Sequence, residues 1–181
     1  MRKLLSAGAA LAVAGLIAGG AWYVLTRPGH PFDDARACPG TDLRLADELA
    51  LTGLPLPRDA HDVHYLAHAS APTGSAKLVV GFRSTGPVMR TWLLANHLVP
   101  APDIDTLRDS YPVGDVGPGA DSPGVCGGLP PITAPGVDIL TPHPSPEGTQ
   151  QTVEVTLQMD AQNIRPTTEV FLTVLAGRQG A

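Results

Sequence analysis

Residues 152–160 read TVEVTLQMD, and their side chains alternate between polar and apolar along the whole stretch. This period of two predicts a β-strand with one buried face. Residues 163–166 then indicate a turn, and residues 169–175 (EVFLTVL) are apolar on both faces. A strand of that kind is typical of the centre of a sheet. The C-terminal part of the chain therefore predicts a hairpin whose second strand is central.

A second hairpin is predicted further upstream, from residues 62–69 and 76–83, which are separated by the turn sequence PTGS. In the second of these strands Leu78, Val80 and Phe82 share one face, as a period of two requires. The two hairpins together indicate a small antiparallel sheet of about four strands.

Two amphipathic helices are expected to back this sheet. Apolar side chains recur at helical spacing through residues 87–98, and Trp92 lies among them. We expect Trp92 to be a core residue rather than one that stacks on a ligand. A shorter helix is predicted to begin after a cap at Thr41 or Asp42 and to end at Gly53.

Residues 99–150 differ from the rest of the chain, because they hold 11 prolines and 8 glycines in 52 residues. Within them only residues 103–109 have a helical pattern. Long irregular segments are uncommon inside compact domains. We therefore predict a long loop over the domain. The element order predicts an α+β fold: a small antiparallel sheet of two hairpins, backed by one or two helices.

The N-terminus carries an uncharged run over residues 4–25, which follows Arg2 and Lys3 and includes Trp22 and Tyr23 near its end. A helix of this length spans about 33 Å, enough to cross a bilayer core of about 30 Å. Positive charge before the run keeps that side in the cytoplasm. The pattern predicts a single-pass helix that holds the C-terminal part outside the cytoplasm, at the cell membrane.

This run divides the chain into an anchor (1–26), a proline-containing juxtamembrane linker (27–40) and an extracytoplasmic domain (41–181). Small residues before Trp22 leave a second interpretation open. A signal peptidase could cut after Ala21, and the protein would then be secreted.

The chain has two cysteines, Cys38 and Cys126, and both follow the predicted anchor. In an oxidising compartment an even number of cysteines favours a disulfide. The bond would close a loop of 87 residues. A loop of that length stabilises the fold by about 4–5 kcal/mol in the chain-entropy model.

The charge balance argues against nucleic acid as a partner. Without Arg2 and Lys3, 10 basic residues remain against 17 acidic ones. No basic cluster occurs in this part, and an acidic domain repels a phosphate backbone.

His61, His64 and His68 are the candidate metal ligands of the sequence. On a helix, positions 64 and 68 would share one face a turn apart, as metal-binding pairs do. On a strand they would lie roughly 13 Å apart, too far for one zinc ion, and His61 would point to the other face. The neighbouring pattern favours a strand, so a row of polar surface histidines is the alternative to a metal site.

Residues 124–128 (GVCGG) resemble a nucleophile elbow, but the buried strand and the helix that such an elbow needs are absent from the flanking sequence. No motif marks a serine of a hydrolytic triad among the four candidates Ser70, Ser75, Ser84 and Ser110. We assign no catalytic residue and no cofactor.

These observations predict a non-enzymatic interaction or accessory module of the bacterial cell envelope. Its expected partners are the membrane, through residues 4–25, and an envelope protein or polymer. One alternative is a metal-binding protein or metal-dependent enzyme that uses the three histidines. A second alternative is a secreted hydrolase.

Overall fold

The computed structural model describes the chain from residue 30 onward, in seven ranges: 30–70, 75–112, 125–127, 129–130, 132, 134–160 and 163–177. None of the helices in these ranges has the length and apolar character needed to span a membrane. The predicted anchor over residues 4–25 and its alternative cleavage site at Ala21 lie outside the described residues.

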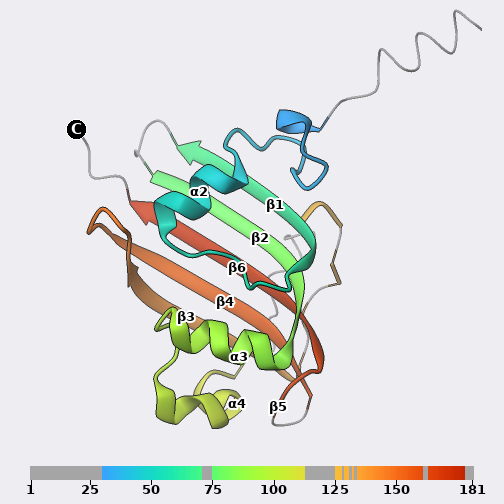
Figure 1. Ribbon diagram of the computed structural model, residues 1–181, viewed down its shortest axis with the longest axis vertical. Helices are drawn as coiled ribbons and strands as arrows, with labels where there is room; N and C mark the ends of the chain where they lie inside the picture. The colour runs from blue at the N-terminus through green and yellow to red at the C-terminus, as the bar shows by residue number, and fades with distance from the viewer. Residues whose placement is uncertain are drawn as a thin grey trace, which may run out of the picture.

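The described residues form a mostly antiparallel sheet with a few helices, which confirms the predicted α+β character (Figure 1). The strand order is β1-β2-β6-β4-β3, and every neighbouring pair is antiparallel. A short strand, β5, pairs with the end of β4. The strands are β1 (His61–Ser70), β2 (Ser75–Thr85), β3 (Gly136–Pro144), β4 (Gln150–Asp160), β5 (Asn163–Ile164) and β6 (Thr167–Gly177).

Strand β6 lies in the middle of the sheet, as its apolar sequence on both faces predicts. It pairs with β2 on one side and with β4 on the other, so it joins the two predicted hairpins into one sheet. Leu172 and Val174 are buried on one of its faces, and Phe171 is buried on the other.

The prediction of a long loop over residues 99–150 is wrong in part, because residues 136–144 form strand β3 at the edge of the sheet. Val137 and Ile139 are buried at alternate positions, but Pro142 and Pro144 obscure this pattern in the sequence. An edge strand tolerates proline where the missing N–H would point away from the sheet. Residues 101–105 (η2) and 107–110 (α4) are helical, close to the predicted range of 103–109.

Helices cover one face of the sheet, which we call the helix face (Figure 1). Helix α2 (Leu45–Thr52) ends at Gly53, whose φ of 69° is the left-handed value that glycine adopts without strain. Helix α3 (Gly86–Ala95) follows β2 directly and is shorter than the predicted range of 87–98. Side chains of both helices pack onto the large core: Leu45, Met89, Trp92 and Leu93 are buried there against β1, β2, β6, β4 and β3.

The opposite face of the sheet carries a second, smaller core. It is formed by a segment that we call the strap, defined by Val125, Leu129 and Ile132, which packs on Phe171. The strap begins with the short helix η3 (Val125–Gly127). We call this side of the sheet the strap face.

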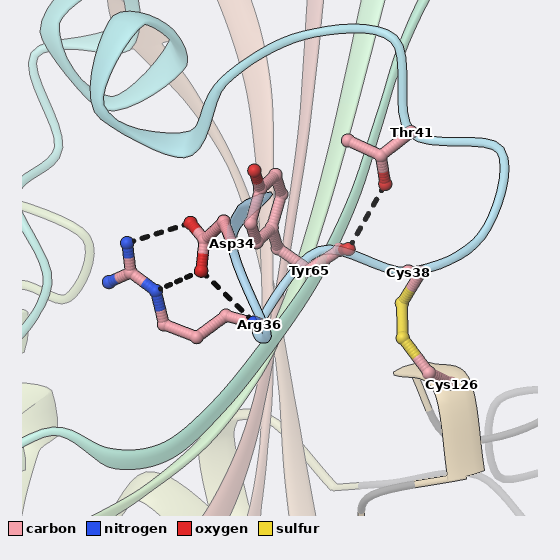
Figure 2. Close-up of a disulfide and its surroundings, with 6 residues drawn as sticks. All are labelled: Asp34, Arg36, Cys38, Thr41, Tyr65 and Cys126. Carbon is pink, nitrogen blue, oxygen red and sulfur yellow. Dashed lines mark hydrogen bonds and ion pairs between the residues drawn. A yellow bond between two sulfur atoms is a disulfide. The ribbon is translucent and has the colours of Figure 1, made fainter. Parts of the chain in front are cut away.

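A disulfide between Cys38 and Cys126 ties the strap to the edge of the sheet, as the sequence predicts (Figure 2). The Cα atoms are 5.4 Å apart. Cys38 belongs to a segment, residues 36–42, that runs alongside β1: its N–H donates to Tyr65 O at 2.8 Å, and Tyr65 N–H donates to Arg36 O at 2.9 Å. The end of the predicted linker is therefore part of the domain. Thr41 Oγ1 adds a third hydrogen bond, also to Tyr65 O.

Candidate functional site

A groove on the outer side of α3 is the candidate functional site, and we call it the Pro–Trp groove. It lies between α3 and the extended segment that leads from α2 to β1. Its volume is about 450 Å³, within the usual range for small-molecule sites. The lining residues are Pro55, Leu56, Pro57, Arg58, Pro87, Val88, Thr91, Trp92, Ala95 and Asn96.

The first wall is the segment 54–58, which two prolines keep extended. Leu54 is fully buried in the large core and fixes the start of this wall. The side chain of Trp92 fixes its middle, because the indole Nε1–H donates to Pro55 O at 2.6 Å. The wall is therefore attached both to the core and to the helix that faces it.

Asp59 fixes the end of this wall to the start of α3. Its Oδ1 accepts from Ser84 Oγ at 2.5 Å, and its Oδ2 accepts from Thr85 N–H at 3.0 Å and Thr85 Oγ1 at 2.6 Å. Loss of solvation raises the pKa of Asp59, but these hydrogen bonds outweigh it, so the pKa lies below the ordinary value of 3.8. The ionised carboxylate is thus the form that the fold favours.

The second wall is the outer surface of α3. Lining positions 87, 88, 91, 92, 95 and 96 recur at helical spacing, so they share one side of the helix. Trp92 is 6% exposed and belongs to the large core, which confirms its predicted role as a core residue, and it also lines the groove. The polar side chains of this wall bond to their own helix: Thr91 Oγ1 donates to Pro87 O and Asn96 Nδ2 donates to Trp92 O.

Arg58 is the one charged side chain in the lining, and it is exposed. It differs from the other arginines, because within the described residues it has no hydrogen bond, ion pair or ring contact. Each of the others in that part of the chain has a partner: Arg36, Arg44, Arg83, Arg90, Arg108 and Arg165. The Pro–Trp groove is therefore an apolar cavity beside a cation that has no partner among the described residues.

The structure places the three predicted metal ligands on β1 without bringing them together. Nothing in the described ranges forms a set of three or more His, Cys, Asp or Glu side chains positioned for a metal ion. His61 Nδ1 contacts Asp59 O, and His68 Nδ1 lies 3.8 Å from Asp42 Oδ2. An irregularity between His61 and His64 shifts the register, so His61 lies opposite Arg83 and His64 opposite Gly81. All three histidines thus occupy the strap face, contrary to the expectation that His61 would point to the other side.

Ser84 lies nearest to an acidic side chain among the candidate serines, but no described histidine accepts a hydrogen bond from it, as a hydrolytic triad requires. Ser84 is fully buried, and its hydroxyl donates to the carboxylate of Asp59 rather than to a histidine. His61 contacts only the main-chain oxygen of Asp59. Cys126, in the elbow-like sequence, is bonded to Cys38 and is not a free nucleophile.

The edges of the sheet are poor places to add a partner strand. Residues 36–42 run along the outer side of β1. On β3, Asp138 N–H points outward to Tyr111 O at 3.0 Å. Backbone groups alternate along a strand, so positions 142 and 144 point outward as well, and both are prolines without an N–H. Main-chain pairing with another chain is therefore restricted at both edges.

Part of the strap face, near the start of β4 and the end of β6, is exposed. Leu140 is 66% exposed there, and Leu175 on the neighbouring β6 is 48% exposed. Glu154 lies between them on β4, and burial raises its pKa above the ordinary 4.5. The carboxylate of Asp138 raises the pKa of Glu154 further, while Lys77 lowers it. This surface mixes charged and apolar side chains.

Comparison with protein-family models, with curated proteins and with solved structures finds no match for this chain. Its function therefore has to be argued from the groove itself. The sequence analysis did not identify this site, one wall of which is the segment LPLP at residues 54–57. Two features of the sequence could have indicated it. Arg58 comes directly after the LPLP segment, and the helical pattern further along, over residues 87–98, has Trp92 near its centre.

Proposed function

We propose that the protein is a non-enzymatic accessory module of the cell envelope that binds an apolar ligand in the Pro–Trp groove. The observation that carries this proposal is the groove itself: about 450 Å³ of space between two largely apolar walls, which hydrogen bonds fix in position relative to each other. A cavity whose walls are fixed before the ligand arrives loses little conformational entropy on binding.

The chemistry of the lining supports binding rather than conversion of the ligand. Arg58 is the one titratable side chain among the ten lining residues, and a guanidinium keeps its charge and serves poorly as an acid or base. The hydroxyl of Thr91 and the amide of Asn96 already donate to main-chain oxygens of α3. An acid–base pair or an activated nucleophile, which catalysis on a ligand would need, is not part of this lining.

The location outside the cytoplasm is part of the proposal. It is supported by the uncharged run at residues 4–25, which follows two basic residues. It is also supported by the Cys38–Cys126 disulfide, since such bonds persist in oxidising compartments.

Photolabelling of the full-length chain in lipid nanodiscs tests the proposed binding. A small neutral aryl diazirine would be irradiated with the protein, and the labelled peptides would be mapped by mass spectrometry. We expect label on residues 55–58 and on α3. Ala95→Trp should fill the groove and reduce this labelling about tenfold, as the loss of about 1.4 kcal/mol of binding would do.

Ala46→Trp is the matched control, because Ala46 is also an exposed helical alanine but lies on α2, outside the groove. This variant should label like the wild type. Equal labelling of the groove peptides in the two tryptophan variants, or no label there in the wild type, would refute the proposed binding site.

A further inference from the structure

We infer that the ligand of the Pro–Trp groove is a single-chain amphiphile with a terminal carboxylate, held by its hydrocarbon chain along α3 and by its charge at Arg58. This inference rests on the proposed function and names the class of ligand.

The walls favour a hydrocarbon over a peptide chain. Pro55 and Pro57 have no N–H to donate, and their carbonyl oxygens already accept from Trp92 Nε1 and from the N–H of Ala60. The side chains of Thr91 and Asn96 also bond within the protein. A peptide in this groove would find no N–H donor and no free carbonyl oxygen at Pro55 or Pro57, and each of its amide groups left unpaired would cost about 1–3 kcal/mol. A hydrocarbon chain has no such groups to satisfy.

The shape of the groove suits an extended chain. Its lining on α3 runs from Pro87 to Asn96, nine residue steps along the helix. At the rise of an α-helix this is about 14 Å. A chain lying along this wall contacts the apolar side chains of Val88, Trp92 and Ala95 in succession.

The charge at the groove selects the head group. The chain carries a formal net charge of −5, so carboxylates outnumber cations on it. Arg58 nevertheless has no partner within the described residues. A guanidinium presents its donors in a planar fork that matches both oxygens of a carboxylate. A ligand carboxylate would therefore supply the partner that Arg58 lacks among the described residues.

Two photoreactive ligands test this inference on the full-length chain in nanodiscs: a diazirine-bearing decanoate and the corresponding decanol. Labelling of the groove peptides would be compared in Arg58→Gln and in Arg44→Gln, which removes an exposed arginine outside the groove. We expect Arg58→Gln to reduce labelling by the decanoate about five- to tenfold, as the loss of one exposed charge-assisted contact would do. Labelling by the decanol should not change, and Arg44→Gln should match the wild type with both ligands.

The outcomes separate this inference from the proposed function. If both ligands label the groove but Arg58→Gln changes the labelling by neither, the inferred carboxylate head group is wrong and the proposed apolar binding site stands. If neither ligand labels the groove while the neutral aryl diazirine does, the chain-like ligand is wrong. Stronger groove labelling by a photoreactive peptide with an acidic end than by the decanoate would also overturn the inference. If no probe labels the groove, the proposed function fails as well.

Discussion

The two faces of the sheet are closed in different ways. On the helix face, α2 and α3 pack their side chains into one large core that extends from β1 to β3. On the strap face, a short segment covers Phe171 and is tied to the edge of the sheet by the Cys38–Cys126 disulfide. The helix face relies on packing, whereas the strap face relies on a covalent bond. The difference matters for function, because the rigidly packed side is the one that holds the groove.

The largest expected effect on stability comes from removing the Cys38–Cys126 disulfide. The double variant Cys38→Ala/Cys126→Ala should lower the free energy of unfolding by about 4 kcal/mol, since the disulfide closes a long loop in the unfolded chain. Urea unfolding of the full chain measures this change. Reduction of the wild-type protein should cause the same loss. A loss below about 1 kcal/mol in both cases would mean that the strap face is held by packing after all.

Two glycines test the difference in packing between the faces: Gly86 lies on the helix face and Gly81 on the strap face. A Cβ at Gly86 on α3 would lie 2.6 Å from Arg165 O, which is backbone and cannot move aside. Gly86→Ala should therefore cost about 2–3 kcal/mol. A Cβ at Gly81 would meet only side-chain ends of the strap core, with Leu129 Cδ1 at 3.2 Å and Phe171 Cε1 at 3.3 Å.

Gly81→Ala should change the free energy of unfolding by less than about 0.5 kcal/mol, because the gain of alanine over glycine in a strand offsets the close contact. Thermal or urea unfolding of the two alanine variants gives the comparison. A cost at Gly81 equal to that at Gly86 would show that the strap is packed as rigidly as the helices.

Two carboxylates whose pKa values shift in opposite directions, Asp59 and Glu154, give a pH-dependent version of the same comparison. The pKa of Asp59, beside the groove, is lowered, so its ionised form stabilises the fold above pH 3.8 and this contribution is lost as the pH falls through the folded pKa. Asp59→Asn should destabilise the protein at pH 7 by about 1–2 kcal/mol, through weaker hydrogen bonds from Ser84 and Thr85. This difference should shrink in acid.

The pKa of Glu154, on the strap face, is raised, so its ionised form destabilises the fold at pH 7. Glu154→Gln should therefore stabilise the protein at pH 7. The advantage should disappear as the pH falls through the folded pKa of Glu154 and below 4.5, where the carboxyl is protonated in both states. Urea unfolding between pH 3 and pH 8 tests both residues. Parallel pH profiles for the two variants would contradict these assignments.

The sequence predicts most of the sheet, because local patterns carry the information. The alternation at residues 152–160 and the two apolar faces at 169–175 predict β4 and the central position of β6. Strand β3 was missed because Pro142 and Pro144 are typical of loops. A strand tolerates them only at the edge of a sheet, and that position is set by the tertiary structure. Covalent pairing of Cys38 with Cys126 was predictable because the chain has only two cysteines.

The groove could not be predicted, because it lies between two segments that are far apart in the chain: Pro55 and Trp92 are separated by 37 positions. Pro55 and Trp92 are each ordinary in their local sequence, and only the fold brings the indole N–H to the proline carbonyl. The lack of a partner for Arg58 among the described residues is also a tertiary property, since it depends on where the acidic residues of the domain lie. The metal hypothesis illustrates the opposite case: three histidines close in sequence occupy a strand and do not converge.

One measurement tests the central claim most directly: a photolabelling map of the full chain with the neutral aryl diazirine, recorded before and after reduction of the disulfide. In the oxidised protein we expect label on the Pro–Trp groove but not on Phe171, nor on Val79, a partly buried residue of β2 that packs against the same small core beneath the strap. After reduction, label should appear on those two residues while groove labelling stays unchanged. Labelling of Phe171 or Val79 in the oxidised protein, or loss of groove labelling on reduction, would contradict the claim that the groove on the helix face is preformed independently of the strap.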